Sequence, residues 1–98
     1  MATSTFELTL PEYGGSRASA ADFTADLPDD LSGMAVHVDC SRGFAISQSF
    51  SDELCKQILQ LRRASSLILQ EPPQRMAVHS ARAADLRALE GLQIIARP

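Results

Sequence analysis

The sequence predicts a small α/β domain in which strands and helices alternate along the whole chain. Segments with alternating apolar and polar residues are separated by segments whose apolar residues lie three or four positions apart. Residues that favour turns, chiefly Gly, Pro and Ser, lie between these segments. The chain has 98 residues, and 45% of them are apolar, which suits one domain, residues 1–98, with an ordinary core.

The first predicted elements are a strand and a helix. Residues 5–10 alternate apolar and polar side chains and are followed by Pro11, which predicts a strand. The serine at position 16 is a candidate N-cap, because a serine oxygen accepts hydrogen bonds from the free N–H groups of a first helical turn. The helix is expected to run to about residue 27, with Ala20, Phe23 and Leu27 on its buried face.

The middle of the chain predicts a turn, a buried strand and a second helix. Residues 28–33 have the composition of a turn, and residues 34–40 are expected to form a central strand. Ser49 and Asp52 have the spacing of a capping box, so Ser49 is the expected N-cap of the second helix. Leu54, Ile58 and Leu61 would form the core-facing stripe of that helix.

The last third predicts a strand, a helix and a final strand. Residues 66–70 are apolar and short, and two prolines follow them, which indicates a buried strand. Residues 75–79 fit either a short strand or a lead-in to the helix expected at residues 80–90. Gly91 has the position of a helix-ending C′ glycine, and residues 92–96 are the last predicted strand.

The resulting order, β-α-β-α-β-α-β, predicts right-handed crossovers and a mostly parallel or mixed sheet. A chain of this length is expected to cover one face of that sheet poorly, with the helices mainly on the other face. The uncovered face or a sheet edge would then be a place for a partner to bind.

The charge distribution and the composition favour a protein partner over nucleic acid. Residues 1–53 contain nine acidic and two basic residues, a net charge of −7, whereas residues 54–98 contain three acidic and seven basic residues, a net charge of +4. Such asymmetry suits docking to a protein or head-to-tail self-association into a homo-oligomer. The chain is acidic overall and has one Tyr and no Trp, so nucleic acid is not an expected partner.

Membrane, secretory and metal-site patterns are not found in the sequence. No apolar run approaches the roughly 20 residues of a membrane span, and the first residues lack the pattern of a secretory signal. Cys40 and Cys55 suggest reduced thiols and a cytoplasmic protein. His37 and Cys40 would point to opposite faces of one strand, so neither a metal site nor a Cys–His nucleophile is expected, and no cofactor is expected.

The residues around the second helix start resemble the centre of a STAS domain, the fold of bacterial anti-sigma factor antagonists. The resemblance covers residues 38–54 most closely. Within it, Ser49-Phe50-Ser51-Asp52-Glu53 is similar to the Ser-Phe-Ala-Asp-Glu signature of a STAS-like branch found alone or beside kinase-type ATPase domains. Residues 15–17 and the Leu-Glu-Gly-Leu run at residues 89–92 are similar to the same branch.

The resemblance implies a bacterial, non-enzymatic, cytoplasmic module of a partner-switching signalling system. Its expected partner is an ATPase-fold kinase or an anti-sigma-like regulator, which would dock on the serine-rich turn and the helix after it. The resemblance also implies gating by phosphorylation, and it implies two sets of site residues. The phosphoacceptor candidates are Ser49, Ser47 and Ser51, and the expected partner-binding residues are Gln48, Phe50, Asp52, Glu53 and Lys56.

Several of these residues have a second interpretation. Ser49 would be only a helix cap if the domain were a constitutive accessory subunit or a small-ligand-binding domain. Phe50 would be a core residue rather than an exposed docking anchor. The arginines at 82 and 87 either solvate a helix face or present a basic patch to an acidic partner.

Overall fold

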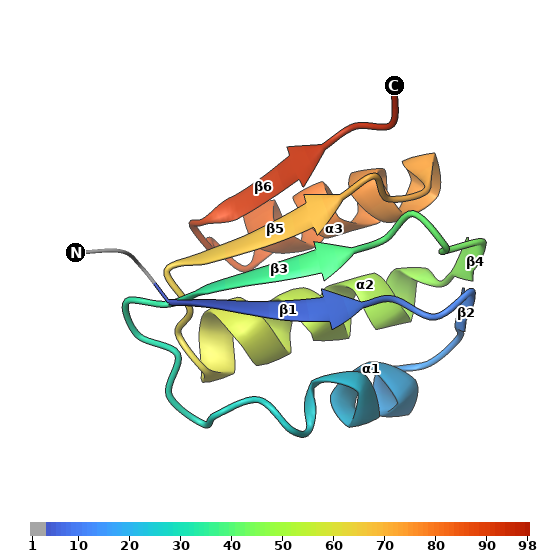
Figure 1. The fold of residues 1–98 in the computed structure, drawn as a ribbon. Helices are drawn as coiled ribbons and strands as arrows, with labels where there is room; N and C mark the ends of the chain where they lie inside the picture. The colour runs from blue at the N-terminus through green and yellow to red at the C-terminus, as the bar shows by residue number, and fades with distance from the viewer. Residues whose placement is uncertain (1–3) are drawn as a thin grey trace.

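The computed structural model describes residues 4–98 and has the predicted α/β architecture, a parallel sheet with helices on one side (Figure 1). The sheet has the order β1-β3-β5-β6, and all its neighbouring strands are parallel. Its strands are β1 (Thr5–Thr9), β3 (Ala35–Asp39), β5 (Ser66–Gln70) and β6 (Leu92–Ile95). The helices are α1 (Arg17–Thr24), α2 (Gln48–Cys55) and α3 (Gln74–Leu86), and a π-helical segment, η1 (Lys56–Leu61), continues α2.

The strand order explains why the helices share one face. Each crossover, from β1 to β3, from β3 to β5 and from β5 to β6, moves one position in the same direction across the sheet. Because crossovers between parallel strands are right-handed, connections that all move the same way place their helices on the same side. Figure 1 shows the sheet in front and the three helices behind it.

The core lies between the sheet and these helices. The strand register aligns Phe6, Val36, Leu67 and Leu92 across the sheet, and it aligns Leu8, Val38, Leu69 and Ile94 two residues further on. The central members of both rows are fully buried. On the edge strands, Phe6, Leu8 and Leu92 are partly covered and Ile94 is exposed. The predicted strands at residues 34–40 and 66–70 are therefore confirmed as the middle of the sheet.

The opposite face of the sheet is open and mostly polar, as the short chain length suggested. His37 lies there, half-exposed, and its Nδ1 is 2.7 Å from Oε2 of Glu7 on the neighbouring strand. Cys40 points the other way into the core, which confirms the prediction that His37 and Cys40 face opposite sides.

Helix α1 begins as predicted. Its N-cap is Ser16, whose side-chain oxygen accepts from the N–H of Ser19, and the Ser19 hydroxyl completes a capping box. The helix ends at Thr24, earlier than the predicted residue 27. Leu27 is nevertheless buried in the core, as expected.

Helix α3 differs from its prediction at both ends. It begins at Gln74, directly after the Pro72-Pro73 pair, so residues 75–79 are helical. It ends at Leu86 rather than at residue 90, and Ala88 takes the positive φ of 54° that was expected at a C′ glycine. Gly91 has a φ of 96° and directly precedes β6, and a Cβ at this position would lie 2.5 Å from the carbonyl oxygen of Ser65. A close approach between two chain segments, not a helix end, thus requires this glycine.

Two short strands, which the sequence did not predict, form a second parallel ladder. Strand β2 (Tyr13–Gly14) pairs with β4 (Ala45–Ile46) beyond the carboxyl end of the main sheet. The N–H of Ser47 then donates to the carbonyl oxygen of Gly14, at 2.8 Å. A Cβ on Gly14 would lie 2.7 Å from the Phe50 ring, so the absence of a side chain lets β2 lie directly over α2.

The carboxyl end of the main sheet is tied to the last residues of the chain. The Arg97 guanidinium donates to the backbone carbonyls of Glu71, Cys40, Ser41 and Gly43, over 2.8–3.4 Å. Within residues 4–98, no helix has both the length and the apolar character that a membrane crossing requires.

Candidate functional site

The Ser47–Glu53 segment lies at the end of the molecule where all three helices begin. In a β-α-β unit the helix runs opposite to its strands, so the helix N-termini lie beside the carboxyl ends of the strands. Ligands of open α/β sheets commonly bind at this end, and unpaired helical N–H groups give it a positive potential. The predicted site residues are therefore in a suitable part of the fold.

Ser47, not Ser49, is the N-cap of α2, so the predicted capping box at Ser49 and Asp52 is wrong. The Ser47 side-chain oxygen accepts from the N–H of Phe50, at 3.0 Å. The reason is non-local: pairing of β4 with β2 holds the chain extended as far as Ser47, and the helix starts immediately afterwards. The spacing to Asp52 favoured Ser49 in the sequence, but serine at 47 has the same capping chemistry.

The three candidate phosphoacceptors have different surroundings. Ser51 is fully buried, and its hydroxyl donates to the carbonyl oxygen of Ser47, at 3.1 Å. Ser47 is half-buried and its hydroxyl oxygen is engaged in the cap. Ser49 is also half-buried, but its hydroxyl forms no hydrogen bond with any residue from 4 to 98. In the folded protein, Ser49 is the candidate with the most available hydroxyl.

The expected partner-binding residues are only partly on the surface. Phe50 is buried, with its ring 6.1 Å from that of Phe23, which corrects the docking-anchor interpretation in favour of core packing. Glu53 is also buried and accepts from Gln57 Nε2 at 2.7 Å, so its carboxylate is used within the domain. Lys56 is half-buried, with its Nζ 3.6 Å from Glu53 Oε1, and Gln48 is exposed.

Asp52 joins the three helices through an ion-pair cluster. Its two oxygens accept from Nε and Nη2 of Arg87 on α3, at 2.9 and 2.8 Å, and it also accepts from Arg17 at the start of α1. The Arg87 hydrogen bonds, together with those of Arg17, hold the pKa of the Asp52 carboxyl well below its usual range. Arg87 is thus a structural partner of Asp52, which corrects its assignment to a solvated face or a free basic patch.

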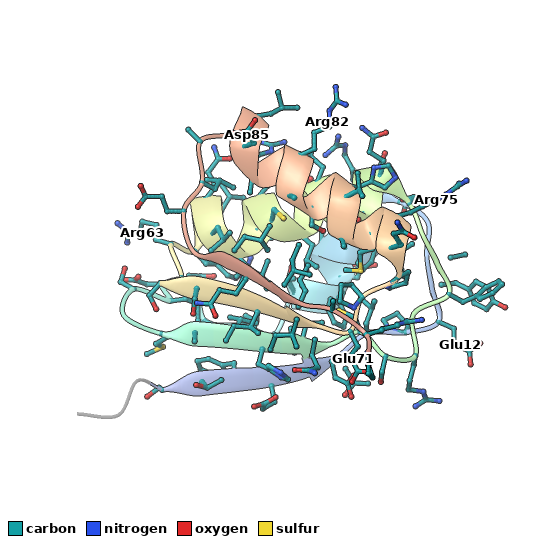
Figure 2. All side chains as sticks on the ribbon, turned by 90° about the horizontal axis from the view of Figure 1, so that it is seen from above. Glu12, Arg63, Glu71, Arg75, Arg82 and Asp85 are labelled. Atoms are coloured by element: carbon teal, nitrogen blue, oxygen red, sulfur yellow. The ribbon has the colours of Figure 1, made fainter. Side chains whose placement is uncertain are left out.

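A hollow of about 430 Å³ lies beside this cluster, between the first turns of α2 and the side of α3 that faces them. The cation Arg82 and the imidazole of His79 line it, and neither forms an ion pair with any residue that the structure describes. Figure 2 shows Arg82 and Arg75 projecting outward from α3. The complete lining is Arg17, Gln48, Ser49, Asp52, His79, Arg82, Ala83 and Leu86. The Ser49 hydroxyl therefore lies in a polar hollow with unpaired positive charge.

An exposed aromatic pair, which the sequence did not indicate, lies on the β2–β4 ladder. Tyr13 is 66% exposed and Phe44 is 77% exposed, and their rings meet edge to face with centroids 6.2 Å apart. A second hollow of about 520 Å³ adjoins this pair. Its lining is Gly15, Phe44, Ala45, Ile46, Ser47, Pro73 and Arg75. The pair and the two hollows meet around the start of α2, at Ser47 and its neighbours.

The cysteines are structural in this arrangement. Cys40 and Cys55 are both buried, and burial raises the pKa of each thiol to about 12. Among residues 4–98, no three side chains of the His, Cys, Asp and Glu types are grouped closely enough to hold a metal ion.

Comparison of this chain with protein-family models, with curated proteins and with solved structures finds no match.

Proposed function

We propose that this chain is a STAS-like regulatory module of a bacterial, cytoplasmic signalling system, which docks an ATPase-fold kinase or an anti-sigma-like regulator. The docking surface comprises the aromatic pair Tyr13 and Phe44 together with residues on α2 and α3. These are the exposed Gln48, Arg75 and Arg82 and the half-buried Ser49. The resemblance of residues 49–53 to the STAS-like signature supports the class of partner.

The exposed aromatic pair is the observation that carries the proposal. Exposed large aromatic side chains are uncommon, and aromatic and arginine residues are enriched among those that dominate protein–protein binding energy. Here the two rings lie beside the expected docking turn, and Arg75 lines the adjoining hollow. An acidic, partly apolar surface on the partner would complement this arrangement.

Phosphorylation of Ser49 is the proposed gate. A phosphate adds about −1.5 to −2 charges and is stabilised near a helix N-terminus. Asp52, one helical turn later, would repel it, but its charge is already balanced by Arg17 and Arg87. The unpaired Arg82 and His79 would attract the phosphate into the hollow, which would remove both Ser49 and positive charge from the docking surface.

Docking is tested by capture of the tagged protein from its native host, identification of the captured protein, and titration of the purified partner against variants. We expect an ATPase-fold partner, and we expect Phe44→Ala to weaken its binding by about tenfold or more. Leu61→Ala is the matched control. Leu61 was predicted to face the core, but it is a 51% exposed apolar residue at the opposite end of the helix layer. Equal affinities of both variants would contradict the proposed docking surface.

Gating is tested separately by adding ATP to the complex and measuring the intact mass of the domain. We expect one phosphate on Ser49 and loss of the partner, with both effects removed by Ser49→Ala and neither changed by Ser32→Ala, a substitution in an exposed turn. A partner that stays bound, with no change in mass, would leave docking intact and assign the domain a constitutive accessory role.

A further inference from the structure

Strand β6 ends the sheet with an uncharged, apolar edge. The residues from 92 to 96 include no charged side chain, and Ile94 and Ile95 are 37% and 46% exposed. Natural sheets usually protect such an edge with charge, proline, a bulge or a covering segment, because its free backbone groups can pair with another chain. The other edge strand, β1, carries the exposed Glu7 at its centre.

The backbone groups that β6 directs outward can be identified from its bonds to β5. The carbonyls of Gly91 and Ile95 accept from Leu67 and Glu71, so these alternate residues face β5. Alternate residues of a strand direct their backbone groups to opposite sides, and Leu92, Ile94 and Ala96 therefore face outward. Their N–H and C=O groups have no backbone partner within residues 4–98.

We propose that two copies of this chain associate through antiparallel pairing of β6, which joins their four-stranded sheets into one continuous sheet. The two-fold axis passes beside Ile94, so that Ile94 pairs with Ile94 of the second copy, and Leu92 of each copy pairs with Ala96 of the other. Every outward N–H of the three residues then meets an outward C=O.

The side chains fit this register. Leu92, Ile94 and Ala96 lie on the helix-facing side of the sheet, since Leu92 and Ile94 align with Leu67 and Leu69 in the core. A hollow of about 270 Å³ extends beside this side of β6, lined by Pro72, Gln74, Ala77, Ile94, Ala96 and Arg97. Leu92 of the second copy, placed opposite Ala96, would enter this hollow and cover the small Ala77 on α3.

A second copy is favoured over another occupant because the edge is complementary to itself. The side chains of β6 are uncharged, so two identical strands can pair without electrostatic repulsion. The contact is two-fold symmetric, so assembly stops at a dimer. Pairing of β6 with β1 of another copy would instead be open-ended and would extend into a filament. An extended segment of a different protein is the remaining occupant, and the experiments separate it from self-association.

The first test is the molar mass of the protein in solution, by light scattering or sedimentation, across a wide concentration range. We expect a monomer–dimer equilibrium, and we expect Ile94→Lys to weaken it by about tenfold or more, because two like charges would face each other at the axis. The control is Leu86→Lys, which changes a 73% exposed apolar residue on the α2-facing side of α3. Ala96→Lys repeats the test at an exposed position if Ile94→Lys does not fold.

The second test identifies the register. Paired residues at the axis have Cα atoms about 5.5 Å apart, within the range of roughly 4.4–6.8 Å that a disulfide spans. Mild oxidation should therefore cross-link Ile94→Cys into a dimer much faster than Leu86→Cys, while the buried Cys40 and Cys55 stay unreacted.

A wild-type protein that is monomeric throughout, a dimer unaffected by Ile94→Lys, or equal cross-linking of the two cysteine variants would each overturn the proposal. If the protein is monomeric, the candidate binding partner of the β6 edge becomes an extended segment of another protein. Phe44→Ala should leave the dimer unchanged, so failure of this inference is distinguishable from failure of the proposed docking surface.

Discussion

At the scale of single residues, the Asp52 side chain links parts of the chain that are far apart in sequence. It binds one arginine near the start of the chain and one near its end, and each lies 35 positions away in sequence. The STAS-like resemblance implied a partner-binding role for Asp52, and no local pattern in the sequence shows that Arg17 and Arg87 converge on it. The Ser49 hydroxyl is free for the same reason, since a contact made by β2 determines where α2 begins.

Asp52→Asn should lower the free energy of unfolding by about 2 kcal/mol at pH 7, the scale of hydrogen bonds to charged groups. The folded pKa of Asp52 lies below its unfolded value of about 3.9, so its stabilisation is complete above that pH and is lost progressively as the pH falls below it. Urea denaturation at several pH values measures the difference, which should shrink towards zero in acid.

Asp22→Asn provides the comparison for this pH series, because Asp22 is exposed on α1 and forms no ion pair within the described part of the chain. The Asp22→Asn variant should have the same free energy of unfolding as the wild type at every pH of the series. A loss for Asp52→Asn that was the same at all pH values would assign the effect to packing rather than to charge.

At the scale of helices and strands, the predictions succeeded where burial and local turn residues decide the structure. The segments that became β3 and β5 are apolar, short and bounded by turn residues, and these features depend little on the rest of the fold. The ladder of β2 and β4 could not be predicted, because two residues form no detectable period. The sequence predicts too late an end for α3, because Gly91 has the pattern of a C′ residue. In the structure, Gly91 instead allows the chain to pass close to the Ser65 carbonyl.

Gly91→Ala should destabilise the domain by about 2 kcal/mol or more, because the substitution strains a positive φ and also places a Cβ against the Ser65 carbonyl. Thermal and chemical denaturation measure this loss. Gly15→Ala is the matched control, since a Cβ there would meet nothing within 4 Å and no positive φ is needed. Equal stability of the two variants would contradict the role given to Gly91.

At the scale of the whole molecule, the alternating pattern and the short chain were enough to predict a mostly parallel or mixed sheet with helices mainly on one face, and the main sheet is fully parallel. The candidate docking surface was less predictable, because Tyr13 and Phe44 become neighbours only through the β2–β4 ladder. The serine-rich turn led the sequence to place the candidate site at this end of the fold. It could not show that Phe50 and Glu53 are buried while Phe44 is exposed.

Both thiols should stay unreactive until the whole domain unfolds, because both are packed in the core. Cys40 and Cys55 are buried, and their raised pKa leaves little of the reactive thiolate at neutral pH. We expect slow labelling by a thiol reagent in native buffer and rapid labelling of both cysteines in denaturant, with Leu86→Cys as the exposed control. Rapid native labelling of either cysteine would contradict this packing.

The one-directional winding of the sheet also bears on how the chain reaches its fold. Each strand of the main sheet pairs with the strand that follows it after a single helical crossover, and no strand is inserted between two earlier ones. Folding rates rise as contacting residues lie closer in sequence. The domain can therefore be assembled by adding one strand–helix unit after another, in the order in which a ribosome releases them.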